Sequence, residues 1–171
     1  MMYEDSEKLN IRAIEFASSG KFIEAIACFK RAITIDAMNY LLWYNLGITY
    51  RDAGDLRKAK DALECAYRLT EGDEEIIETL ALVCFTLADF DEAFDYYSEA
   101  LDINDANARC WNNMGVLFFN RNDYLAACDA FERAVCISPY YYDALFNLRD
   151  TYHELGNRIG AAECVRRLSE L

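Results

Sequence analysis

Apolar residues recur at helical spacing along the whole chain. Residues 40–73 carry two such sets, separated by the turn Ala53-Gly54-Asp55. The first set is Trp43, Leu46, Gly47 and Tyr50, and the second is Ala59, Leu63, Ala66 and Leu69. This spacing places apolar side chains on one face of a helix. The pattern therefore predicts two antiparallel helices, whose backbones approach closely where Gly47 and Ala59 leave room.

The same pattern returns at a constant interval. One position is alanine in all five copies: Ala25, Ala59, Ala93, Ala127 and Ala161. A fixed period of about 34 residues indicates a stack of similar supersecondary units. We therefore predict a single domain over residues 1–171, made of the blocks 6–39, 40–73, 74–107, 108–141 and 142–171.

Two blocks carry a recognisable motif. Residues 43–50 match W-x2-L-G-x2-Y at every fixed position. The fourth block matches the longer pattern through Trp111, Met114, Gly115, Phe118, Ala127, Phe131, Ala134 and Pro139. The chain thus resembles the tetratricopeptide repeat (TPR) family over residues 6–171. The resemblance implies an all-α fold, a right-handed superhelix of about five antiparallel helix pairs. As a guide to function it is weak, because one fold hosts many partners.

The two ends of the array depart from the pattern. Arg12, Arg149, Arg158 and Ser169 stand where other blocks have apolar or small residues. Terminal repeats need a polar outer face because no neighbour covers them, so we interpret these residues as caps. The family's usual additional C-terminal helix is missing, and we expect Leu168 and Leu171 to be partly exposed there. A homo-oligomer through the C-terminal end is therefore possible.

The family resemblance also implies a binding surface. In TPR proteins the first helix of each pair lines a concave groove that binds peptides. The corresponding positions, spaced at i, i+4 and i+7, are apolar in the middle of the array and polar at its edges. We expect the groove to be formed by Asn10, Ile14, Ala17, Tyr44, Ile48, Arg51, Glu78, Leu82, Phe85, Asn112, Val116, Phe119, Phe146, Asp150 and His153.

A neighbouring groove column reads Ile11, Asn45, Thr79, Asn113 and Asn147. Its asparagines resemble the ladder with which some family members hold the backbone of an extended peptide, since an amide both donates and accepts hydrogen bonds. Local hydrogen bonds within the scaffold are the alternative interpretation, and both stay open. Binding of acidic C-terminal tails is not expected, because Glu75 and Thr79 stand where such a clamp needs basic residues.

Charge is distributed unevenly. The net charge is −13, and residues 74–107 contain ten acidic residues and no basic one. Asp89, Asp91 and Glu92 are expected to lie at a helix start, whereas Glu75 and Glu78 should face the groove, with Arg109 as a candidate counter-charge. The field favours a neutral to basic protein or peptide partner. It disfavours nucleic acid and anionic membranes.

No catalytic motif is present. His153, the only histidine, has no nucleophile motif beside it, and we interpret it as a surface or groove residue. The seven cysteines form no CxxC pair and are expected to be reduced and mostly buried. Residues 1–6 lack the basic and apolar regions of a secretory signal, so we expect a cytoplasmic protein.

The sequence therefore predicts a non-enzymatic scaffold without cofactors or metals, which binds a protein segment in its groove. The alternative is an assembly subunit that self-associates or docks into a larger complex through its terminal repeats.

Overall fold

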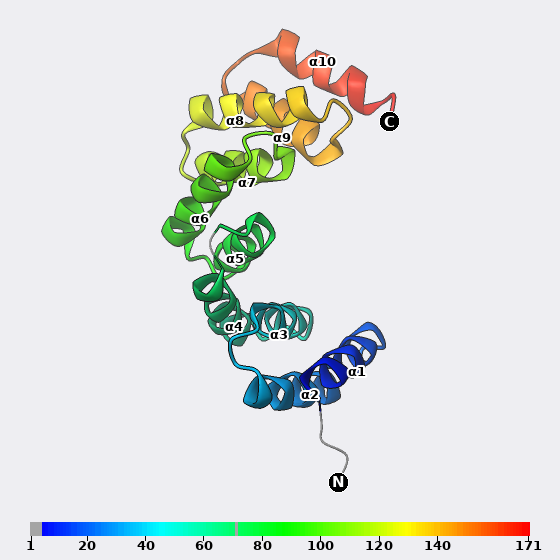
Figure 1. The fold of residues 1–171 in the computed structure, drawn as a ribbon. Helices are drawn as coiled ribbons and strands as arrows, with labels where there is room; N and C mark the ends of the chain where they lie inside the picture. Colours follow the sequence, from blue (N-terminus) through cyan, green and yellow to red (C-terminus); the bar gives the residue numbers. More distant parts are fainter. Residues whose placement is uncertain (1–4, 71) are drawn as a thin grey trace. The chain divides into compact units, whose positions relative to one another are not determined.

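The computed structural model describes residues 5–70 and 72–171, which form ten helices (Figure 1). Residues 1–4, part of the N-terminal sequence considered above, and residue 71 lie outside the described residues. The first helices of the five pairs are α1 (Ser6–Ser18), α3 (Tyr40–Asp52), α5 (Glu74–Thr86), α7 (Ala108–Asn120) and α9 (Tyr142–Glu154). The second helices are α2 (Phe22–Ile35), α4 (Leu56–Leu69), α6 (Phe90–Ile103), α8 (Tyr124–Ile137) and α10 (Arg158–Leu168). Every helix starts one repeat period after its counterpart in the preceding pair, so the predicted all-α fold is confirmed.

The chain falls into two compact units, residues 1–96 and residues 97–171, with the boundary inside α6. In unit 1, α1 packs on α2, α2 on α3, α3 on α4 and α4 on α5. In unit 2, α7 packs on α8, α8 on α9 and α9 on α10.

The repeated alanines lie at helix–helix contacts in the core. Each is at most 2% exposed. In unit 2, Ala127 belongs to a core cluster with Phe131, Val135, Leu145, Leu148 and Cys164. The repeated alanine column is therefore a packing requirement and carries no information about a ligand.

Glycine allows the closest helix approach in two pairs. A Cβ atom added to Gly47 would lie 2.6 Å from Leu63 Cγ and 3.3 Å from the carbonyl oxygen of Ala59. A Cβ atom on Gly115 would lie 2.6 Å from the ring of Phe131. The predicted close approach at Gly47 is therefore confirmed, and the second helix supplies both a side chain and backbone to it.

The turn inside each pair has one residue in the left-handed region. These residues are Gly20, Gly54, Ala88, Asn122 and Gly156, with φ between 60° and 83°. Only glycine adopts this conformation without steric cost. The third pair nevertheless keeps this turn with Ala88 at φ 64°, a conformation that has a steric cost for alanine.

Side chains form recurring hydrogen bonds at the N-terminal ends of the first helices and in the loops before them. Asp5, Asn39, Asp73 and Asn107 cap the first helices of four pairs by accepting hydrogen bonds from backbone N–H groups. Trp43 and Trp111 each donate from the indole Nε1 to a carbonyl oxygen six residues earlier, at 2.8 Å. The signature tryptophan thus fixes the loop that precedes its helix.

All seven thiols are free, and four of them are buried: Cys84, Cys110, Cys128 and Cys164. Cys136 is exposed. Over residues 5–70 and 72–171, no helix combines the length and the apolar character that a membrane crossing requires.

The polar residues predicted as caps have local partners or face solvent. The guanidinium of Arg12 lies 5.4 Å from the ring centroid of Phe16, and Arg158 and Ser169 are exposed. Leu171 is 54% exposed and Leu168 is half-buried, which agrees with the expectation for this end.

Candidate binding surface

A row of polar side chains crosses the first helices of unit 1. The amide Nδ2 of Asn45 on α3 donates to Oδ1 of Asn10 on α1 at 3.2 Å. The hydroxyl of Tyr44 donates to a carboxylate oxygen of Glu75 on α5 at 2.7 Å and lies 3.5 Å from Thr79 Oγ1. Each contact joins neighbouring repeats, so these side chains help to set the register between first helices.

Unit 2 repeats the arrangement. Asn147 Nδ2 on α9 donates to Oδ1 of Asn112 on α7 at 2.9 Å, across the same 35-residue separation as Asn10 and Asn45. Asn113 donates to the hydroxyl of Tyr97 at 3.1 Å. Asn112 is only 5% exposed, and its amide reaches Asn113 Oδ1 at 3.4 Å. The predicted groove column therefore contains structural hydrogen bonds.

These hydrogen bonds can be compared with the two interpretations of the asparagine column, peptide binding and local bonding within the scaffold. The Nδ2 groups of Asn45, Asn113 and Asn147 each donate within the scaffold. The Oδ1 atoms of Asn45 and Asn147 accept no hydrogen bond from the described residues. Local hydrogen bonding is thus present in the structure, and a peptide-binding role for the remaining acceptors stays a prediction.

Two buried threonines donate hydrogen bonds to the backbone carbonyl groups of the asparagines. Thr49 donates to the carbonyl oxygen of Asn45 at 2.7 Å, and Thr151 donates to that of Asn147 at 2.8 Å. In both pairs the hydroxyl bonds the preceding turn of its own helix. These threonines occupy equivalent positions of the second and fifth repeats, and sequence reasoning did not single them out.

A hollow of about 230 Å³ opens between α1 and α3 in unit 1. Its floor is Phe29 of α2, which is almost fully buried. Its walls are Ile14, Ala17, Ser18, Asn45, Ile48, Thr49 and Asp52. The carboxylate of Asp52 accepts from the guanidinium of Arg51 at 2.9 Å.

A second hollow, of about 210 Å³, opens between α7 and α9 in unit 2. It is lined by Val116, Phe119, Asn120, Phe131, Asn147 and Asp150. Each of these residues lies three repeat periods after a residue of the first hollow. The two hollows therefore occupy the same place in the repeat, although they belong to different units.

The sequence predicted part of this lining. Ile14, Ala17 and Ile48 of the first hollow, and Val116, Phe119 and Asp150 of the second, come from the expected groove columns. The floor residues Phe29 and Phe131 were missed, because they belong to second helices. Their signal was available in the sequence, because Phe29, Leu63, Tyr97, Phe131 and Val165 form an apolar column at the repeat period.

The other predicted groove residues have varied environments. Leu82 is 40% exposed, whereas Glu78 is half-buried. Phe85 contacts the ring of Phe90, with centroids 5.7 Å apart, and Phe146 stacks on Tyr142 at 6.3 Å. The two remaining positions, Arg109 on α7 and His153 on α9, are exposed.

The acidic residues of α5 and α6 have specific partners. Burial is the main reason that the pKa of Tyr44 rises to about 12, and its hydrogen bond to Glu75 contributes.

Asp89 precedes α6, and Glu92 lies in its first turn, as expected. Lys60 of α4 binds both carboxylates, at 3.0 Å and 2.5 Å. The hydrogen bond to Glu92 raises the pKa of Lys60.

An ion pair in the last pair of helices also lies beside the predicted surface. Arg149 donates to one oxygen of Asp150, Oδ1, from Nε at 2.9 Å and from Nη2 at 2.7 Å. Its guanidinium lies 3.9 Å from the ring centroid of Phe146. Arg149, interpreted as a cap, therefore also holds two groove residues in place.

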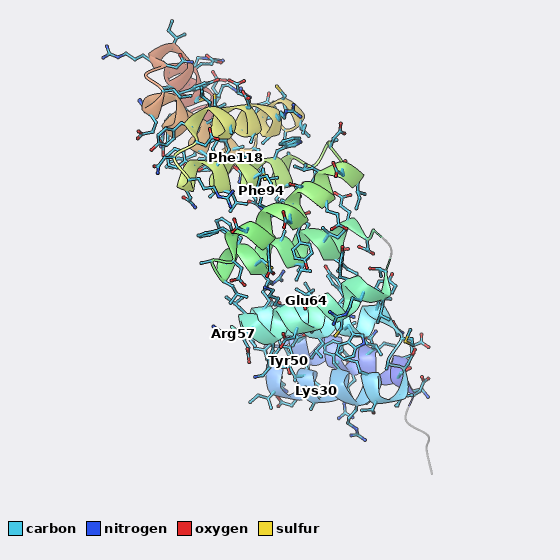
Figure 2. All side chains as sticks on the ribbon, turned by 90° about the vertical axis from the view of Figure 1, so that its left-hand side faces the viewer. Lys30, Tyr50, Arg57, Glu64, Phe94 and Phe118 are labelled. Carbon is cyan, nitrogen blue, oxygen red and sulfur yellow. The ribbon has the colours of Figure 1, made fainter. Side chains whose placement is uncertain are left out.

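Two lysines of second helices lie near the ring of Tyr50 in unit 1. Lys30 of α2 lies 5.9 Å from the ring centroid (Figure 2). Lys58 of α4 lies 5.6 Å from it. Within residues 5–70 and 72–171, no group of three or more His, Cys, Asp or Glu side chains is arranged to hold a metal ion.

Comparison with known families agrees with the repeat geometry. The family model described as "Tetratricopeptide repeat" matches residues 44–108 and 79–142, and the model described as "TPR repeat" matches residues 15–54. The chain belongs to the tetratricopeptide repeat family. TPR proteins generally mediate protein–protein interactions and the assembly of complexes.

Individual relatives share the repeats over part of their length. "BBSome complex member bbs-4" of Caenorhabditis elegans is 25% identical over 147 residues, which are 86% of this chain and 32% of that protein. The chain thus spans about a third of the length of this relative.

Two solved structures share the fold. A crystal structure of MamA superposes with a TM-score of 0.87 at 23% identity and covers 92% of both chains. YrrB, described as "a TPR protein with an unusual peptide-binding site", gives a TM-score of 0.81 at 22% identity, over 97% of this chain and 86% of YrrB.

Proposed function

We propose that this chain is a non-catalytic interaction module that binds an extended, neutral to basic segment of a partner protein on its first helices. The observation that carries the proposal is the pair of equivalent hollows, one between α1 and α3 and one between α7 and α9. Their volumes lie below the ~300–1,000 Å³ typical of small-molecule sites. Each therefore suits a single side chain of a bound segment.

The polar groups beside the hollows suit a peptide backbone. An accepting Oδ1 atom remains on Asn45 and on Asn147, and the neighbouring bonds to Asn10 and Asn112 hold both amides in fixed orientations. A backbone N–H of an extended segment could donate to each oxygen without dictating sequence. Preformed polar groups of this kind lower the ordering cost of binding. The peptide-binding site of YrrB, which shares this fold, supports the same class of ligand.

A selection from a pool of random 12-residue peptides tests the proposal. We expect the protein to enrich binders, and we expect a ¹⁵N-labelled sample to show the largest amide shifts on α1, α3, α5, α7 and α9. Combining Phe85→Ala with Phe119→Ala should weaken binding about tenfold or more, since both rings lie on these helices. Leu125→Ala is the matched control, because Leu125 is 72% exposed on the second helix α8. Failure to enrich binders, or shifts confined to second helices, would contradict the proposal.

The exposed apolar side chains on and after α10 favour a second function, assembly through the C-terminal end. On α10, Ile159 is 86% and Val165 is 51% exposed, and Leu171 follows at 54%. The bbs-4 relative is named as a member of a complex, which supports a docking role. If α10 mediates self-association, Ile159→Glu should convert an oligomer to a monomer in sedimentation velocity. Ile23→Glu is the matched control, since Ile23 occupies the equivalent position of the first pair and is 83% exposed. A wild-type protein that sediments as a monomer at high concentration rules out self-association.

A further inference from the structure

The two equivalent hollows differ in chemistry at the positions that face a bound side chain. Ile48 lines the first hollow, and Asp150 takes its place in the second. Ala17 of the first hollow corresponds to Phe119 of the second. The aromatic floor and the asparagine are unchanged. The scaffold is therefore the same, and the side-chain preference is expected to differ.

The carboxylate of Asp150 can accept a further hydrogen bond. Both donor atoms of Arg149 reach Oδ1, and Oδ2 accepts none from the described residues. The stacking of Arg149 on Phe146 fixes the guanidinium, which keeps the carboxylate in place. Asp150 is half-buried, so a bound cation would be partly shielded from water.

The first hollow also contains a carboxylate, that of Asp52, but at a different position of the repeat from Asp150. Asp52 lies four residues after Ile48, which is one helical turn farther along α3 from Asn45. Ile48 follows Asn45 by three residues, at the position that Asp150 takes after Asn147. A side chain beside the asparagine thus meets an aliphatic wall in unit 1 and a carboxylate in unit 2.

Resting on the proposed function, we infer that the hollow between α7 and α9 selects a lysine or arginine of the bound segment. The aliphatic stem of that residue lies against Phe119, Val116 and the floor Phe131, and its cationic head binds Asp150 Oδ2. Long basic side chains bury their stems in this way while the charged end stays in a polar environment. The hollow between α1 and α3 takes an aliphatic side chain.

The test uses the same pool of random 12-residue peptides, selected in parallel on the wild type and on Asp150→Ile. The wild type should enrich peptides with Lys or Arg at one fixed position. Selection on Asp150→Ile, which copies the first hollow, should replace that residue with Leu, Ile or Met. The reciprocal change Ile48→Asp should raise the share of Lys and Arg among selected peptides that shift the amides of α1 and α3.

A dissociation constant gives the decisive comparison. For one peptide selected on the wild type, replacing the basic residue with norleucine removes the charge and keeps the stem. This replacement should weaken binding to the wild type about fivefold, as expected for a partly shielded ion pair. It should leave binding to the isosteric variant Asp150→Asn unchanged. Asp129→Asn, an exposed carboxylate on α8, is the control and should behave like the wild type.

The outcomes separate the two proposals. Enrichment of binders without a basic position, or equal affinity of the norleucine peptide for the wild type, overturns this inference and leaves the proposed function standing. A basic preference that persists in both Asp150 variants also overturns it. A pool that yields no binder overturns the proposed function itself, and the inference with it.

Discussion

The second and third repeats have the same backbone and different sequences. Their helices start at residues 40 and 56, and at 74 and 90, so the bounds of the two repeats coincide after a shift of one period. The second repeat has Gly47 at the helix crossing and Gly54 in the turn. The third has Ala81 and Ala88 at these positions, together with ten acidic residues. The third repeat therefore keeps the same helix bounds without either glycine, and its Ala88 holds the left-handed conformation that glycine adopts freely.

The largest effect is expected from crowding the helix crossing of the second repeat. Gly47→Val would place its first added carbon 2.6 Å from Leu63 Cγ, so α3 and α4 must separate. We expect a loss of about 3 kcal/mol in the free energy of unfolding, measured by urea denaturation. Ala27→Val is the control on an exposed position of α2 and should cost about 0.5 kcal/mol. Equal losses would show that the crossing at Gly47 is not tightly packed.

Exchanging the turn residues of the two repeats should shift stability in opposite directions. Ala88→Gly relieves the left-handed conformation at φ 64° and should raise the free energy of unfolding by about 1 kcal/mol. Gly54→Ala introduces the same strain at φ 83° and should lower it by about the same amount. Thermal unfolding of both variants measures the difference. If Ala88→Gly destabilises the protein, the extra freedom of glycine in the unfolded chain outweighs the strain.

Removal of Lys60 should have a smaller, salt-dependent effect. Lys60 binds Asp89 and Glu92, and its side chain is only 17% exposed, although both carboxylates are about half-exposed. Lys60→Met should therefore lower the free energy of unfolding by about 0.5 kcal/mol at low salt. The deficit should shrink in 1 M NaCl, which screens the repulsion between the two carboxylates. Arg68→Met, which breaks an exposed pair with Glu64, is the control, and an equal deficit there would contradict a special role for Lys60.

The thiols of the two repeats should react with iodoacetamide at different rates. Cys84 of the third repeat is fully buried, and burial is the main cause that raises its pKa to about 12. At pH 8 the thiol is therefore protonated and inaccessible. Cys65 of the second repeat is half-buried and accepts a hydrogen bond from Arg68 at 3.3 Å. Iodoacetamide should modify Cys65 at least about tenfold faster than Cys84, as followed by mass spectrometry. Equal rates would show that α5 opens rapidly.

The helix pairs and their phase could be predicted from the order of residues alone. The constant repeat period and the apolar spacing predicted where each pair lies, because helix formation and the choice of a buried face depend on residues close together in the chain. For the same reason the columns containing Val116, Phe119 and Asp150 could be assigned in advance to one helix face.

The side-chain contacts between repeats, by contrast, became known from the packed structure. Asn45 bonds Asn10, and Lys60 bonds Glu92, because neighbouring helices approach at particular distances that no local pattern encodes. The left-handed turn at Ala88 was likewise not predictable from the residue itself, since the preference of alanine opposes that conformation. The two hollows also arise in this way: a phenylalanine of a second helix closes the space between two first helices, and only the packed repeats bring the three together.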